Sequence, residues 1–135
     1  MQACSEEDWL RLRDLRLKEA RERLDSAPPD VVYDHVRVAA EFCMKAAIAR
    51  KKKFNEWPDN LRTHDLKALS ERGDLAREIS DICRQKPRFR TYWFMLRGTT
   101  DRRYALSRMP RSYVRELLNA LEDKDEGLVK CMSDL

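Results

Sequence analysis

Apolar residues recur at helical spacing along most of the chain, with short polar or proline-containing breaks between the recurrences. Over residues 5–25 they fall on one face, which predicts an amphipathic helix. Over residues 30–53 the apolar surface is broader and contains several alanines. That pattern predicts a central helix that its neighbours approach closely. Shorter helices are expected over 63–72, 75–85, 88–97 and about 110–121.

Candidate capping residues indicate where these helices begin. We expect Ser5, Asp30, Thr63 and Asp74 to be N-caps, because short polar side chains accept hydrogen bonds from the first free backbone amides. A helix capped by Thr63 places His64 in its first turn. There the positive end of the helix dipole disfavours an imidazolium and favours a neutral ring.

Composition supports an all-α fold. The chain has 135 residues, of which 42% are hydrophobic and 39% charged, with only 3 glycines. That length suits one domain spanning residues 1–135. The low glycine content and the many Arg, Glu, Leu and Ala residues are typical of helical proteins.

The four cysteines suggest the compartment. Cys4, Cys43, Cys83 and Cys131 lie far apart, form no C-x-x-C pair and have no His at metal-ligand spacing. We therefore expect reduced thiols, a cytoplasmic location, no metal and no cofactor. The start of the chain shows no leader pattern, and no uncharged apolar stretch approaches the roughly 20 residues of a membrane span, so no membrane association is expected.

Charge is distributed unevenly. Residues 84–115 contain ten Arg or Lys and one acidic residue, a net charge of +9, whereas the other residues contain 18 basic and 23 acidic ones. Aromatic residues are interleaved with these arginines, and cations with aromatic faces are what single-stranded nucleic acids require. The simpler interpretation is that "TYWFML" is the buried face of a helix and that the arginines are solvated or paired with carboxylates.

Three segments resemble, in order, the HEPN family. They are "YDHVRVAAEFCMKAAIAR" at 33–50, "RTHDLKAL" at 62–69 and "DRRYAL" at 101–106. The resemblance rests on Ala39, Glu41, Lys45 and Ala46 in the first segment, on T-H-D-L in the second and on Arg-Tyr in the third. It implies an up-and-down helical bundle, here of about five helices, that forms a homodimer. It also implies RNA or nucleotide ligands and a role in prokaryotic toxin–antitoxin or defence systems.

The catalytic pattern of the family's ribonucleases is absent. Those members carry an Arg, four to six further residues and then a His. For His64 the Arg would fall at 57–59, and for His35 at 28–30, and neither range contains one. The resemblance therefore implies a branch that shares T-H-D-L and lacks the ribonuclease motif, and it does not carry over the family's ribonuclease activity.

The candidate ligand-binding residues come from all three segments: Lys45, Arg62, His64, Arg102, Arg103 and Tyr104. His64 is also the candidate catalytic residue, although the favoured interpretation is that it orients the loop between the second and third helices. Glu41 and Lys45 are spaced i,i+4, which fits either an exposed pair or a partly buried one that fixes helix register.

Three functions remain open. The first is a non-catalytic dimer that binds RNA or a nucleotide through an Arg-rich surface. The second is a divergent ribonuclease or toxin that uses His64, with Arg62 and Arg103 beside it. The third is a protein-interaction module whose partner is encoded nearby, such as a nucleotidyltransferase, since the uneven charge suits a complementary interface.

Overall fold

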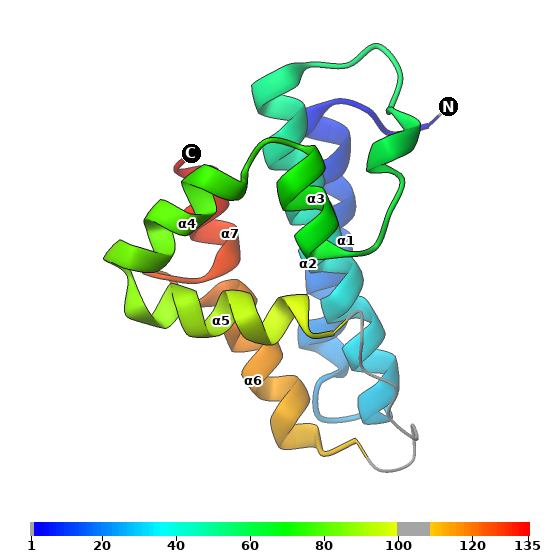
Figure 1. The fold of residues 1–135 in the computed structure, drawn as a ribbon. Helices are drawn as coiled ribbons and strands as arrows, with labels where there is room; N and C mark the ends of the chain where they lie inside the picture. Colours follow the sequence, from blue (N-terminus) through cyan, green and yellow to red (C-terminus); the bar gives the residue numbers. More distant parts are fainter. Residues whose placement is uncertain (1, 100–108) are drawn as a thin grey trace.

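Two long antiparallel helices, α1 (Glu6–Arg23) and α2 (Pro29–Lys52), form one side of the molecule (Figure 1). The computed structural model describes residues 2–99 and 109–135, and no β-strand occurs within these ranges. The all-α prediction is therefore confirmed. The remaining elements are η1 (Asp59–Leu61), α3 (Leu66–Arg72), α4 (Ala76–Gln85), α5 (Pro87–Arg97), α6 (Arg111–Glu122) and α7 (Leu128–Ser133).

The described residues form seven α-helices, whereas the resemblance implied about five and the helical periodicity predicted six. The helix that neither expectation included is α7, and the predicted division between α4 and α5 is present. Lys86 is at once the C-cap of α4 and the N-cap of α5, and Pro87 opens α5. Proline suits that first helical position because its missing N–H would have no intrahelical partner there.

Helix α2 is central, as its pattern predicted. Thirteen of its residues are buried, and it packs against α1, α3, α6 and α7. The small residues Ala39, Ala40 and Ala46 are almost fully buried, which allows neighbouring backbones to come close. At one end of the helix, the Tyr33 hydroxyl donates to the Thr99 carbonyl at 2.6 Å and fixes the end of α5 against α2.

The predicted caps of the first two helices have different outcomes. Ser5 caps α1 as predicted: its hydroxyl accepts from the Asp8 amide at 3.1 Å, and the Asp8 carboxylate accepts from the Ser5 amide. Asp30 was the wrong choice for α2. That helix begins at Pro29 with Pro28 as its N-cap, because a proline at the first position is already held in a helical φ.

The expected N-cap of the third helix is also wrong. Asp65, not Thr63, caps α3, accepting from the amides of Lys67 at 2.9 Å and Ala68 at 3.2 Å. The Thr63 hydroxyl instead accepts from the Asp65 amide at 3.1 Å and shapes the loop before the cap. His64 therefore precedes the N-cap and lies outside the first turn of α3.

The junction between α3 and α4 depends on Gly73. A Cβ at this buried position would lie 2.4 Å from Cδ1 of Ile48, so only glycine lets α3 end against α2. The expectation that Asp74 caps α4 is wrong, because Leu75 is the N-cap. Asp74 has a φ of 59° and forms an ion pair with Lys52 on α2.

Candidate functional site

Glu41 and Lys45 form a buried ion pair on α2. The Lys45 ammonium lies 2.9 Å from Oε2 of Glu41, and the two residues are 3% and 6% exposed. Of the two interpretations that the sequence left open, the structure bears out burial. Charges withdrawn from water at this depth are tolerated only when they are paired and hydrogen-bonded.

His64 forms a hydrogen bond with the second oxygen of the Glu41 carboxylate. Its Nδ1 lies 2.5 Å from Oε1 of Glu41, and the imidazole is otherwise largely exposed. An ionised carboxylate only accepts hydrogen bonds, so Nδ1 carries the proton and donates it. The contact ties the loop before α3 to α2, and it fixes the orientation of the imidazole.

Aromatic rings surround the Lys45 ammonium. It lies 5.0 Å from the centroid of Trp9 and 6.0 Å from that of Trp57, which are distances of cation–π attraction. The Trp57 indole N–H donates to the Leu61 carbonyl at 2.9 Å. The Trp9 indole N–H is buried and has no hydrogen-bond partner among the described residues.

A hollow of about 420 Å³ brings three of the predicted residues together. Lys45, Arg62 and His64 line it beside the two tryptophans. Each of these three side chains is engaged within the protein. The Arg62 guanidinium, for example, donates to Asp59 at 3.1 Å, to the Gln2 side chain at 2.6 Å and to the Trp57 carbonyl at 3.1 Å. The three predicted residues are thus held by contacts within the protein, and only the Trp9 indole N–H beside them has no described partner.

The other three predicted ligand-binding residues, Arg102, Arg103 and Tyr104, lie outside the described residues.

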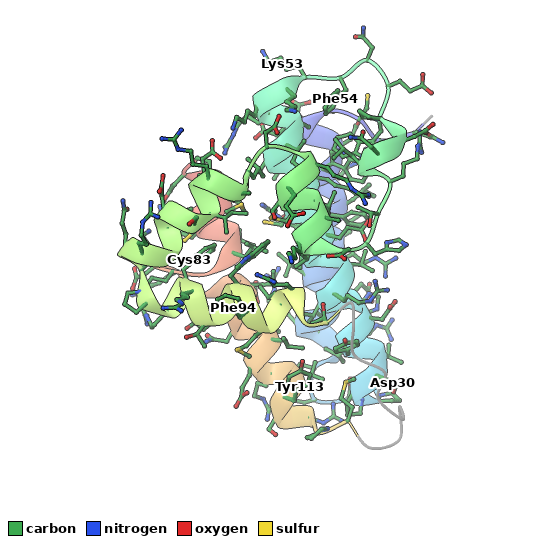
Figure 2. All side chains as sticks on the ribbon, viewed as in Figure 1. Asp30, Lys53, Phe54, Cys83, Phe94 and Tyr113 are labelled. Carbon is green, nitrogen blue, oxygen red and sulfur yellow. The ribbon has the colours of Figure 1, made fainter. Side chains whose placement is uncertain are left out.

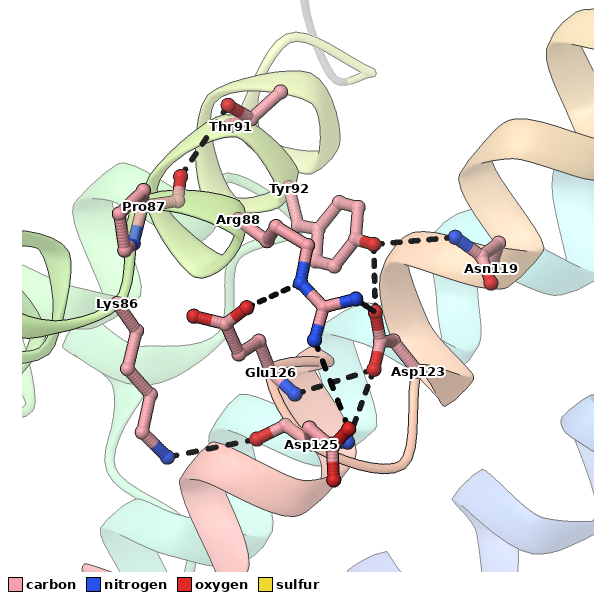
Figure 3. Close-up of polar contacts among 9 residues, drawn as sticks. All are labelled: Lys86, Pro87, Arg88, Thr91, Tyr92, Asn119, Asp123, Asp125 and Glu126. Carbon is pink, nitrogen blue, oxygen red and sulfur yellow. Dashed lines mark hydrogen bonds and ion pairs between the residues drawn. The ribbon is translucent and has the colours of Figure 1, made fainter.

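The structure assigns most of the described arginines of the basic segment to structural contacts. Arg88 lies among three carboxylates at the α6–α7 turn, with Asp123 at 3.3 Å, Asp125 at 3.7 Å and Glu126 in closer contact (Figure 3). Beside it, the Lys86 ammonium donates to the Asp125 carbonyl at 3.5 Å. These contacts fasten the start of α5 to the C-terminal helices.

Three further arginines are paired. Arg84 contacts Asp81 on its own helix, and Arg115 contacts Asp25 at the end of α1. Arg111 donates to two backbone carbonyls between α1 and α2. Arg111 and Arg115 therefore join α6 to the segment between α1 and α2, whereas the pair of Arg84 lies within α4.

Arg90 and Arg97 differ from these residues. Neither forms an ion pair with any described residue, although Arg97 lies 4.9 Å from the ring centroid of Phe94. Both arginines and Phe94 lie on α5. Figure 2 labels Phe94 on that helix and Cys83 on α4 beside it.

These residues line two adjoining hollows that we call the arginine groove. The inner hollow, of about 470 Å³, lies among α3, α4 and α5, and the outer one, of about 1110 Å³, lies between α4 and α5. Both are lined by Cys83, Arg84, Arg90 and Phe94. Lys67 on α3 adds a further cation to the inner hollow, and Glu71 is the one acidic residue among the described lining residues.

The pKa of the Cys83 thiol depends on the charges around the groove. Partial burial raises this pKa, and the positive charges of Arg90 and Arg97 oppose that rise. Arg90 and Arg97, which form no ion pair with a described residue, therefore contribute a positive potential at Cys83, and such a potential suits an anionic ligand.

The sequence predicted an anion-binding role for the basic segment as a whole, without singling out Arg90, Arg97 or Phe94. It gave no indication that Lys67 belongs to the same site. The spacing of Arg90, Phe94 and Arg97, at i, i+4 and i+7, was the available signal, because it places all three on one face of a helix. Nothing in the sequence indicated that α3 brings Lys67 to that face.

Comparisons of the chain with protein-family models, with curated proteins and with solved structures find no match. Among the described helices, none has the length and apolar character that crossing a membrane demands.

Proposed function

We propose that this protein is a non-catalytic, HEPN-like domain that binds RNA through the arginine groove. The observation that carries the proposal is that Arg90 and Arg97 have no carboxylate partner among the described residues, while the neighbouring Arg84, Arg88 and Arg115 do. An arginine without a partner contributes little to folding, and its planar donors suit phosphate oxygens.

The HEPN part of the proposal rests on the three resembling segments. One structural observation supports it: Glu41 from the first segment and His64 from the second are in contact through a hydrogen bond. The family implies a homodimer and a role in a prokaryotic defence or toxin–antitoxin system, and we include both in the proposal. Sedimentation at several protein concentrations tests the dimer, and a single species of 16.1 kDa at all of them contradicts it.

The test of RNA binding is fluorescence anisotropy with a short labelled single-stranded RNA at several salt concentrations. We expect binding that weakens as salt rises, because each phosphate contact releases counterions. The double substitution Arg90→Gln/Arg97→Gln should weaken binding and make the slope of log K against log salt shallower by about 1.4, at about 0.7 per lost contact.

The matched control is Arg23→Gln/Arg37→Gln, which removes the same charge from the α1–α2 hairpin. Each of these arginines pairs with a carboxylate of its own helix, so neither substitution should disturb the fold. Equal weakening in the two double variants would show a general charge effect and contradict the groove. No binding by the wild type at low salt would contradict RNA as the ligand and favour a protein partner, such as a nucleotidyltransferase.

A second candidate function is acid–base cleavage of RNA at His64. The observation that favours it is the buried Glu41 carboxylate, which orients an exposed imidazole as general bases require. The RNA recovered from the titration should be run on a gel. Intact RNA supports the binding module, and cleavage that disappears in His64→Ala supports the enzyme.

A further inference from the structure

We infer that the arginine groove is selective for single-stranded RNA, with one unpaired base stacked on the ring of Phe94. This inference rests on the proposed function, and it adds the form of RNA that is bound and the residue that selects it.

Phe94 is the one described aromatic side chain of the basic segment that is largely exposed, at 52%. Phe89 and Trp93 are in the core, so the helix-core interpretation holds for them. Tyr92 is partly buried, and its hydroxyl donates to Asp123 at 2.7 Å and accepts from Asn119 at 3.3 Å (Figure 3). Tyr113 is also partly buried, and its ring stacks on that of Tyr33 at a centroid distance of 6.4 Å. Among the described aromatic residues of this segment, Phe94 therefore offers the most exposed ring to a ligand.

A single exposed phenylalanine is common on protein surfaces, so exposure alone does not indicate a site. The surroundings of Phe94 do, because it lines both the inner and the outer hollow. Arg97 lies against the ring and lines only the inner hollow. A base that enters the outer hollow can therefore lie on the ring, with the guanidinium on the inner side.

The positions of Arg90 and Arg97, which pair with no described carboxylate, suit a strand that passes over this ring. Arg90 precedes Phe94 by one helical turn, and Arg97 follows it by one turn. Seven residues of α-helix span about 10 Å, so the two cations flank the ring along the helix axis. The backbone of a strand with one base on Phe94 therefore has a phosphate partner on either side.

A duplex cannot use Phe94 in this way. Its bases are stacked on one another, and proteins recognise double-stranded RNA through the phosphates and 2′-hydroxyls at its surface. Stacking of an unpaired base on an aromatic side chain contributes about 1–3 kcal/mol, which corresponds to about 5- to 150-fold in affinity.

The experiment compares the affinity for an eight-nucleotide single-stranded RNA with that for a blunt RNA duplex, at one low salt concentration. Phe94→Ala should weaken binding of the single strand by about 5- to 150-fold and change binding of the duplex less than twofold. Phe94→Tyr keeps a ring at this position and should restore the single-strand affinity. The control is Leu15→Ala, which truncates an equally exposed apolar side chain on α1 and should change neither affinity.

The arginine variants separate failure of this inference from failure of the proposed function. If Arg90→Gln/Arg97→Gln weakens binding but Phe94→Ala leaves the single-strand affinity unchanged, the groove binds phosphates only and the stacking inference is overturned. Equal loss for single strand and duplex in Phe94→Ala also overturns it. If neither the arginine pair nor Phe94 affects binding, the proposed function itself fails.

Discussion

At the scale of single residues, the Glu41–Lys45 pair shows what local spacing can and cannot predict. The i,i+4 spacing predicted the contact on the helix. Its burial depends on Trp9 and Trp57, which come from segments on either side in the chain. Contacts between distant segments leave no signature in the spacing of two residues, so the sequence alone allowed an exposed pair equally well.

We predict that Lys45→Met lowers the free energy of unfolding by about 3–5 kcal/mol, because it leaves the Glu41 carboxylate buried without its cation. The control is Lys51→Met, which breaks the exposed pair with Glu78 and should cost about 1 kcal/mol or less. Urea unfolding followed by circular dichroism measures both. An equal loss of unfolding free energy in Lys45→Met and Lys51→Met would contradict the prediction, because it would show that the buried pair contributes no more to stability than the exposed one.

At the scale of elements, the turn between α6 and α7 fixes the start of α5. This acidic turn separates α6, which ends at Glu122, from α7, which begins at Leu128. Its role as the partner of Arg88 could not be predicted, since the two segments are 38 residues apart. Asp123 is the centre of this turn: it accepts from the Asp125 and Glu126 amides and from the Tyr92 hydroxyl.

These contacts make the attachment of α5 sensitive to acid. The Asp125 amide, followed by the Tyr92 hydroxyl, the Glu126 amide and the charge of Arg88, lowers the pKa of Asp123 below its ordinary value. A carboxyl with a lowered pKa in the folded state contributes stability above its unfolded pKa of about 3.9. That contribution is lost as pH falls through the folded pKa.

We therefore predict that Asp123→Asn lowers the urea midpoint at neutral pH and that the difference from wild type shrinks progressively below about pH 4. Circular dichroism across a pH series measures it. Asp59→Asn is the control, because that side chain is fully exposed and its removal should leave the midpoint almost unchanged. If the difference in urea midpoint between wild type and Asp123→Asn stayed constant down to strongly acidic pH, the stabilisation would not come from the charged form of Asp123.

At the scale of the whole molecule, helical periodicity and composition were sufficient to predict the fold class and the central position of α2. They did not predict the arginine groove. The +9 segment indicated where positive charge lies in the chain. Which of its described arginines pair with a carboxylate depends on where Asp81, Asp123 and Asp25 lie in the fold. Charge counted along a sequence is therefore an upper limit on the charge available to a ligand.

One core unites the described helices, and we predict that they unfold in a single transition. Buried apolar residues from all seven α-helices form one cluster. Trp9 and Trp57 lie beside α2, whereas Trp93 lies on α5. Urea curves from tryptophan fluorescence and from circular dichroism should therefore coincide, as they do for small cooperative domains. Separate midpoints would show that the helices around α5 unfold independently of the α1–α2 hairpin.

The two kinds of arginine on α5 also differ in what natural selection can act on. Arg88 joins helices, so a change there lowers the amount of folded protein whether or not a ligand is present. Arg90 and Arg97 contact no described carboxylate, so folding alone places little constraint on them. If the groove lost its ligand, random mutation would therefore change these two positions before position 88.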